Sequence, residues 1–151
     1  MGGIFESILP LTMSSTSNVV IEVGAGLVFD QGRLLITQRL QGVHLAGLWE
    51  FPGGKREHDE SFAACVEREL MEELGLLVRA ESCFSGLVHR YPEKTVRLEF
   101  WCCRVVSGVA RPIGCSDVRW VRRGELRDYS FPAADHQLLE LLERTVSLWA
   151  M

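Results

Sequence analysis

The sequence predicts a single domain of the α/β class in its mixed, α+β form, with a mixed β-sheet sandwiched between helices. Three observations lead to this prediction. The 151 residues are enough for one domain and no more. The 47% hydrophobic and 24% charged fractions are ordinary for a globular chain. Segments typical of strands are interleaved with two helical segments without a regular strand–helix–strand repeat. We expect residues 1–17 to form a flexible tail and residues 18–151 to form the domain.

The domain is expected to begin with a hairpin. Residues 19–29 are rich in Val and Ile and are followed by Asp30, Gln31 and Gly32, which is typical of a strand and a turn. Residues 33–39 form the predicted second strand. Residues 41–55 contain four glycines and a proline, so we expect mostly loop with one short strand.

The clearest helix is predicted over residues 61–74. Glu60 and Ser61 offer an acidic, capping start, and Gly75 offers a stop. Five apolar residues fall on one stripe at helical spacing, and this stripe predicts the buried face. They are Phe62, Ala63, Val66, Leu70 and Leu74.

The remaining elements are predicted from apolar runs and turn residues. Residues 76–88 and 95–106 are expected to be strands, joined by a turn at residues 91–94. Residues 118–121 predict a further short strand, and residues 133–148 predict a second helix. Phe100 and Trp101, adjacent in a strand, are expected to pack in the core.

Charge and cysteine content exclude several functions. With 16 basic and 20 acidic residues the formal charge is −4, which argues against binding nucleic-acid polymers or anionic membranes. No apolar run approaches the length of a membrane span. The five cysteines contain no Cys-x-x-Cys pair, so neither a disulfide framework nor a thiolate zinc site is expected. We expect a cytoplasmic protein.

Three glutamates of the first predicted helix form the main chemical signal. Glu69, Glu72 and Glu73 stand at i, i+3 and i+4, so they project together beside the buried stripe. Clustered, partly buried carboxylates stay ionised together when a cation lies between them. Such hard oxygen ligands suit Mg²⁺ or Mn²⁺ shared with substrate phosphates. The alternative is a solvated acidic helix face.

The spacing of the residues around these glutamates favours a metal site over a solvated helix face. The pattern Gly-x5-Glu-x7-Arg-Glu-Leu-x-Glu-Glu-x-Gly-Leu is matched at every specified position between Gly54 and Leu76. This stretch resembles the signature of the Nudix hydrolases. Residues 49–55, 35–39 and 131–135 are also similar to segments of the MutT-type members of that family.

The resemblance implies a fold, a cofactor and a reaction. In MutT-type members a nucleoside triphosphate binds over the helix and is hydrolysed to monophosphate and pyrophosphate. Divalent ions would be held here by Glu69, Glu72, Glu73 and the carbonyl of Gly53, with Glu69 as ligand or base. An ion pair of Glu60 with Arg68 would orient the helix and loop.

Five side chains are candidates for contacting the nucleotide. Arg39 and Lys55 could meet phosphate oxygens, although Lys55 could equally be a solvated loop charge. Lys94 lies in the predicted strand turn and could touch the nucleotide. Tyr91 and Phe51 could stack on or wall the base, with core packing as the alternative for Phe51.

Asp135 stands where guanine-reading MutT members resemble one another in having Asn. An ionised Asp only accepts hydrogen bonds, so it suits the amino groups of cytosine or adenine better than guanine O6, unless it is protonated. The alternative is that Asp135 merely caps the last helix.

One departure from the family concerns the general base. Gly114 occupies a position where the resemblance would place a glutamate, and Asp117 is the nearest acidic substitute. Which carboxylate would act as base is therefore open.

Three functions remain. The first is Mg²⁺-dependent hydrolysis of nucleoside triphosphates, sanitising oxidised nucleotides such as 8-oxo-dGTP or oxidised dCTP. The second is hydrolysis of ADP-ribose, dinucleotide polyphosphates or nucleotide sugars. The third is a non-catalytic nucleotide-sensing module. The expected partner is a nucleotide, for a monomer or homodimer.

Overall fold

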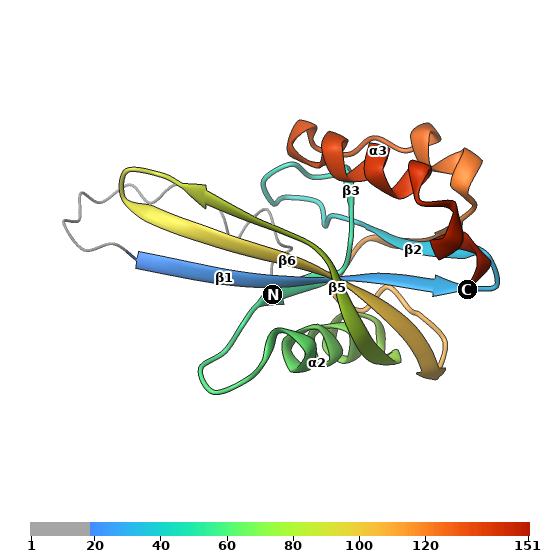
Figure 1. The fold of residues 1–151 in the computed structure, drawn as a ribbon, viewed down its shortest axis with the longest axis horizontal. Coiled ribbons are helices and arrows are strands. Elements are labelled where there is room, and N and C mark those ends of the chain that lie inside the picture. Colours follow the sequence, from blue (N-terminus) through green and yellow to red (C-terminus); the bar gives the residue numbers. More distant parts are fainter. Residues whose placement is uncertain (1–18) are drawn as a thin grey trace.

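The computed structural model describes residues 19–151, and the tail expected at residues 1–17 lies outside them. A seven-stranded mixed sheet carries α2 on one face and α3 on the other, as predicted (Figure 1). No helix within residues 19–151 has the length and apolarity needed to cross a membrane. The strands are β1 (Val19–Asp30), β2 (Arg33–Gln38), β3 (Trp49–Glu50), β4 (Gly53–Lys55), β5 (Leu77–Arg90), β6 (Lys94–Ser107) and β7 (Asp117–Val121).

The two longest strand pairings form the centre of the sheet. The strand order is β3-β2-β1-β6-β5, with β4 added to β1 and β7 added to β2. β1 runs parallel to β6 from Val19 opposite Lys94 to Phe29 opposite Arg104. The predicted hairpin of β1 and β2 is present, but its paired register covers only Phe29 and Asp30 of β1. Further along β1, residues 23–25 pair with β4 instead.

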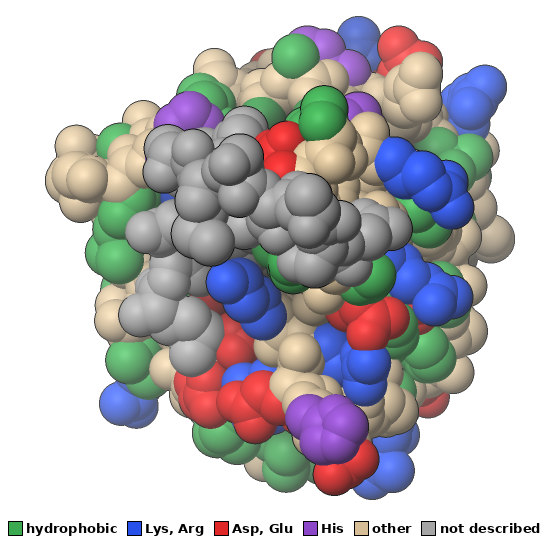
Figure 2. All heavy atoms as spheres, turned by 90° about the vertical axis from the view of Figure 1, so that its left-hand side faces the viewer, with side chains coloured by type: hydrophobic (Ala, Val, Ile, Leu, Met, Phe, Trp, Pro, Cys, Tyr) green, Lys and Arg blue, Asp and Glu red, His purple; other side chains and the backbone are tan. Residues whose placement is uncertain are grey.

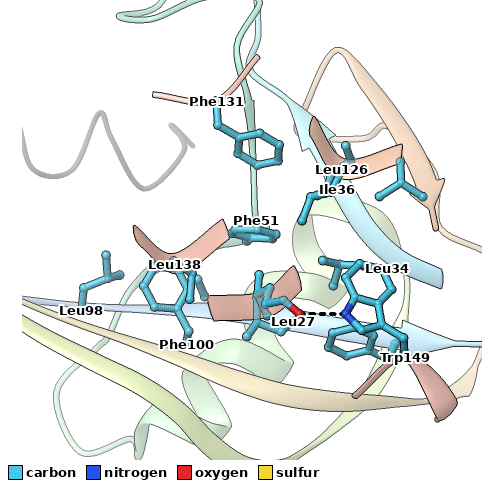
Figure 3. Close-up of a cluster of buried hydrophobic side chains, with 14 of the residues drawn as sticks. Leu27, Leu34, Ile36, Phe51, Leu98, Phe100, Leu126, Phe131, Leu138 and Trp149 are labelled. Atoms are coloured by element: carbon cyan, nitrogen blue, oxygen red, sulfur yellow. Dashed lines mark hydrogen bonds between the residues drawn. The ribbon is translucent and has the colours of Figure 1, made fainter. Parts of the chain in front are cut away.

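Each face of the sheet has its own apolar layer. The layer under α3 contains Phe51, Phe100 and Phe131, and Trp149 packs edge-on against Phe29 with ring centroids 5.1 Å apart (Figure 3). The layer under α2 contains Val66, Leu70 and Leu74, with Trp101 packed against it. Phe100 and Trp101 therefore pack on opposite faces, as alternation along a strand requires. Phe100 lies in the core, as predicted, whereas Trp101 is partly buried and packs against the core.

Helix α2 (Phe62–Leu74) begins and ends close to the predicted bounds. The Ser61 hydroxyl accepts a hydrogen bond from the Ala64 amide at 3.0 Å, and Gly75 ends the helix in the left-handed conformation (φ 65°). Val66, Leu70 and Leu74 of the predicted stripe are buried, while Phe62 and Ala63 are only partly buried. The buried face also includes two of the three glutamates.

The second predicted helix, over residues 133–148, is interrupted. The structure has a 3₁₀ turn at Ala133–Asp135, helix α3 at His136–Arg144 and another 3₁₀ turn at Val146–Ala150. The break lies at Thr145, whose hydroxyl donates to the Leu141 carbonyl at 2.7 Å. The turn lets the Trp149 indole donate to the Leu142 carbonyl, so the chain end packs on the core. A third 3₁₀ helix, Arg123–Asp128, was not predicted.

The surface carries charges of both signs. On the face at the left-hand side of Figure 1, acidic and basic side chains are interspersed (Figure 2). Single-sign fields that steer polymeric partners come from clustered charges of one sign. This face shows a mixed charge distribution instead.

Candidate active site

Helix α2 turns two of its three clustered glutamates toward the sheet. Glu69 and Glu73 are 2% and 5% exposed, whereas the Glu72 side chain is 43% exposed. Burial raises the pKa of the Glu69 carboxyl. Burial, reinforced by the charges of Glu50 and Glu69, raises the pKa of Glu73 well above its ordinary value. A bound cation would favour the ionised form of both groups.

Strand β4 lies against this helix because it consists of glycines there. A Cβ atom on Gly54 would lie 2.0 Å from Oε1 of Glu69, and one on Gly53 would lie 2.1 Å from the Gly24 carbonyl oxygen. No other residue allows so close an approach. A backbone hydrogen bond from Gly53 partly offsets the rise in the pKa of Glu73. The structure thus brings together Gly53, Glu69 and Glu73, all predicted metal ligands.

Arg68 is the cation that the carboxylates share in this structure. Its Nε and Nη2 atoms donate to the two oxygens of Glu60 at 3.0 and 2.7 Å, which is the ion pair expected from the sequence. Its Nη1 atom lies 2.9 Å from Oε2 of Glu69 and 3.4 Å from Oε2 of Glu72. The hydrogen bonds from Arg68 lower the pKa of the Glu60 carboxyl. Arg68 therefore joins the loop before α2 to the acidic face.

The carboxylate and carbonyl oxygens at this site are chemically suited to a divalent metal. Oxygen Oε1 of Glu69 is buried and has no hydrogen-bond partner among the described residues. Hard carboxylate and carbonyl oxygens are the ligands that Mg²⁺ and Mn²⁺ prefer. Within residues 19–151, however, no three acidic, His or Cys side chains are arranged as a ready-made metal site. Arg68 accounts for this, because it neutralises one oxygen of Glu69 and draws Glu72 toward itself.

A cavity of about 390 Å³ opens between strands β5 and β6 and the start of α3. Its volume falls in the range of small-molecule sites. Its lining combines apolar side chains with polar ones from β5, the turn after β5 and the start of α3. It is lined by Leu87, His89, Tyr91, Val96, Leu98, Ala133, Ala134, Asp135 and Gln137.

Asp135 is the buried polar residue of this cavity. It is 3% exposed, and its Oδ2 atom has no hydrogen-bond partner within residues 19–151. It precedes α3 but makes no side-chain capping hydrogen bond, so capping does not explain it. Burial, with the nearby charge of Glu50, raises the pKa of Asp135 to about 7. The predicted nucleotide-contacting carboxyl thus lies in a cavity with an unused acceptor.

Tyr91, a predicted neighbour of the base, also lines the cavity. Its ring lies 4.3 Å from that of His89, and the Lys94 ammonium lies 5.5 Å from the Tyr91 centroid. His89 was missed, although strand alternation places it on the same face as Leu87. Lys55 is exposed at the end of β4, where its carbonyl accepts a hydrogen bond from Arg68.

Besides Asp135, three predicted nucleotide contacts are buried in the structure: Phe51, Arg39 and Lys94. Phe51 is fully buried, with ring centroids 5.3 Å from Phe131 and 6.2 Å from Phe100, so it packs in the core (Figure 3). Arg39 is 1% exposed and is therefore not an open cation. It donates to the His44 carbonyl at 2.7 Å and to Glu50 at 3.2 Å. The buried carboxylate of Glu50 needs this partner.

The segment after β6 packs Gly114 against the end of α2. The amides of Ile113 and Gly114 donate to the Glu73 carbonyl at 3.1 and 2.9 Å, which satisfies the end of α2. A Cβ on Gly114 would lie 3.3 Å from Cγ of Glu73. Asp117, the substitute considered above, accepts from Arg119 at 2.6 Å and from the Val118 amide. It is engaged locally within β7.

The family follows from a match that includes both parts of this site. The family described as "NUDIX domain" matches residues 24–141, from β1 into α3. The chain belongs to the Nudix family. It is therefore a Nudix hydrolase, and the acidic face of α2 is its family signature. The resemblance to this family is confirmed, and so is the mixed sheet between helices.

Characterised Nudix relatives cover most of the chain. The 8-oxo-dGTP diphosphatase of Haemophilus influenzae is 31% identical over 126 residues, 82% of this chain and 91% of the relative. The CTP pyrophosphohydrolase of Escherichia coli is 32% identical over 121 residues, 80% of this chain and 90% of the relative. The solution structure of the E. coli ORF135 protein is 31% identical with a TM-score of 0.71, covering 88% of this chain and 96% of that protein.

Proposed function

We propose that this Nudix hydrolase cleaves nucleoside triphosphates to nucleoside monophosphate and pyrophosphate with Mg²⁺ or Mn²⁺. The single observation that carries the proposal is a pair of buried carboxylate oxygens without a hydrogen-bond partner within residues 19–151, Oε1 of Glu69 and Oδ2 of Asp135. Glu69 lies on the acidic face of α2, and Asp135 lines the cavity. A nucleotide with its base beside Asp135 would place its phosphates toward α2.

The residues would divide the work as follows. Glu69, Glu72, Glu73 and the Gly53 carbonyl would hold the divalent ions. The bound metal would neutralise negative charge on the phosphoryl oxygens and lower the pKa of an attacking water. Glu69 or Glu73, both buried with raised pKa values, would accept the proton of that water. Arg68 holds Glu69 in place through one oxygen and leaves the other free. Lys55, which is exposed, would approach the phosphates or sugar, and Tyr91 the base.

The substrate class is proposed from the relatives and from Asp135. Relatives named 8-oxo-dGTP diphosphatase and CTP pyrophosphohydrolase are about equally similar to this chain. We propose oxidised or amino-bearing nucleoside triphosphates as substrates, and a role in cleansing the nucleotide pool before DNA synthesis. A cytoplasmic, freely diffusing monomer or homodimer would suit that role.

A product assay tests the proposal. Normal and oxidised triphosphates, ADP-ribose, a dinucleotide polyphosphate and a nucleotide sugar would each be incubated with Mg²⁺ and with Mn²⁺. Pyrophosphate and a monophosphate from a triphosphate support it. AMP and a sugar phosphate from ADP-ribose as the main reaction would overturn it in favour of the second enzyme class. No hydrolysis of any compound would overturn it in favour of a sensing module.

Metal binding can be measured without turnover. Because an ion that binds only the folded state stabilises it, Mg²⁺ should raise the melting temperature of the wild-type protein. Glu69→Gln should weaken this rise, since it removes the charge of a proposed ligand. Equal rises in the two proteins would contradict the assigned ligands.

A further inference from the structure

A second cavity extends the nucleotide cavity past Asp135. It measures about 230 Å³ and is lined by residues of β5 and α3 together with Phe100. Both cavities are lined by Leu87, Ala134, Asp135 and Gln137. Asp135 and Gln137 are the two polar members of this shared set. Both side chains therefore line the space that the two cavities share.

The polar side chain of Gln137 is not used for hydrogen bonding among the described residues. It lies in the first turn of α3, is exposed, and makes no side-chain hydrogen bond within residues 19–151. Its amide carries two donors and one acceptor. Asp135, two positions earlier, has a buried oxygen without a partner. An unsatisfied acceptor and an unused donor thus face the same space.

We propose that Gln137 is a specificity-determining residue that reads the edge of the base together with Asp135. The Asp135 carboxylate accepts a hydrogen bond from an exocyclic amino group, and the Gln137 amide donates one to the adjacent ring nitrogen. This inference rests on the proposed function, because it assumes that a nucleotide base occupies the cavity.

The pair of side chains matches one class of base. Cytosine presents the N4 amino donor next to the N3 acceptor, and adenine presents the N6 donor next to the N1 acceptor. Uracil and guanine present a carbonyl acceptor next to a ring N–H donor, which is the reverse arrangement. A carbonyl of uracil or guanine placed against the Asp135 carboxylate would leave two acceptors facing each other. A buried acceptor without a donor costs free energy. The site therefore selects amino-bearing bases.

The surroundings of Asp135 determine the conditions of the test. Glu50 on β3 contributes a negative charge, and β5 and the turn after it contribute His89 and Tyr91, with Lys94 over the Tyr91 ring. From β6, the cavity walls are apolar. Because burial and Glu50 raise the pKa of Asp135 to about 7, the carboxylate form predominates above that pH. Assays at alkaline pH therefore test recognition of the base by the ionised Asp135 carboxylate.

The experiment compares kcat/KM for CTP, ATP, UTP and GTP at alkaline pH with Mg²⁺. Gln137→Glu keeps the shape of the side chain but removes its donors. We expect it to lower the ratio of CTP to UTP about tenfold relative to wild type, the equivalent of one hydrogen bond. Gln137→Leu should act in the same direction. Glu140→Gln is the matched control, because Glu140 lines a separate depression on the other side of α3, and should leave the ratio unchanged.

A readout without catalysis separates base recognition from chemistry. Binding of CMP and UMP, measured by calorimetry without metal, should show the same loss of preference in Gln137→Glu. Unchanged CMP and CTP preference in this variant would overturn the inference while the proposed function stands. A preference of the wild type for UTP, GTP or 8-oxo-dGTP over CTP and ATP would also overturn it. Failure to hydrolyse every triphosphate would overturn the proposed function itself.

Discussion

The Nη1 atom of Arg68 lies 2.9 Å from Oε2 of Glu69, while Oε1 of the same carboxylate is buried and has no hydrogen-bond partner within residues 19–151. Arg68 therefore neutralises one oxygen of the Glu69 carboxylate, and the other oxygen remains available to a metal cation. Burial makes such an unpaired oxygen costly. The arrangement is stable because Arg68 also bridges Glu60 and Glu72, so that one guanidinium organises the acidic face.

Removing Arg68 should destabilise the protein. In Arg68→Gln, the partly buried Glu60 and the buried Glu69 lose their cation, and we expect a loss of about 1–3 kcal/mol in the free energy of unfolding. Urea denaturation in metal-free buffer measures it. Arg104→Gln is the control, since Arg104 is 58% exposed in its pair with Glu81 and should cost less than about 0.5 kcal/mol. Equal losses would show that Arg68 is an ordinary surface charge.

Gly54→Ala should disable the acidic cluster by steric contact. The new Cβ would lie 2.0 Å from Oε1 of Glu69, so the carboxylate must move away from β4. We expect kcat to fall at least about a hundredfold, because misplacing a catalytic group by about 1 Å has effects of that size. Gly124→Ala is the control, since a Cβ there meets no atom within 4 Å. Wild-type turnover in Gly54→Ala would contradict the proposed role of Glu69.

Much of this site could be predicted from the sequence because its geometry depends on residues that are close together in the chain. The i, i+3, i+4 spacing of Glu69, Glu72 and Glu73 fixes their shared face on any helix. Ser61 and Gly75 delimit that helix by short-range hydrogen bonds, which neighbouring residues determine. The exposure of Glu72 and the burial of Glu69 and Glu73 follow from the same periodicity.

The parts that could not be predicted depend on contacts between distant residues. Phe51 packs in the core because Phe100 and Phe131, far away in the sequence, enclose it. Arg39 is buried because Glu50 on the neighbouring strand needs a cation. The interruption of the last helix at Thr145 depends on Trp149 reaching the core, which local propensity does not encode.

Glu73→Gln should abolish turnover, whereas Asp117→Asn should cost less than about tenfold in kcat. Glu73 is buried beside Glu69 and Gly53, and loss of its charge removes a proposed metal ligand. Asp117 is already occupied by Arg119 at 2.6 Å, so it is poorly placed to replace the acidic residue absent at Gly114. Steady-state assays at saturating Mg²⁺ measure both variants. A similar collapse in both would make Asp117 part of the catalytic machinery.

The stability of the protein should depend on pH through Asp135. Burial raises the pKa of its carboxyl from 3.8 to about 7 in the folded state, so the folded protein retains a proton that the unfolded chain has already released. A state that binds more protons loses relative stability as the pH rises. The contribution of Asp135 is therefore fully present below about pH 4 and is lost progressively up to about pH 7.

Asp135→Asn removes this dependence, because the amide does not ionise. The free energy of unfolding of this variant, relative to wild type, should increase from pH 5 to pH 8.5 by as much as about 3 kcal/mol, because about two pH units of the shift lie in this range. Urea titrations in metal-free, nucleotide-free buffer measure the difference, and Glu140→Gln controls for the loss of one exposed carboxylate. If the difference between Asp135→Asn and wild type were the same at both pH values, Asp135 would not be held in a desolvated environment. The cavity beside it would then be too open to the solvent for its carboxylate to discriminate between bases.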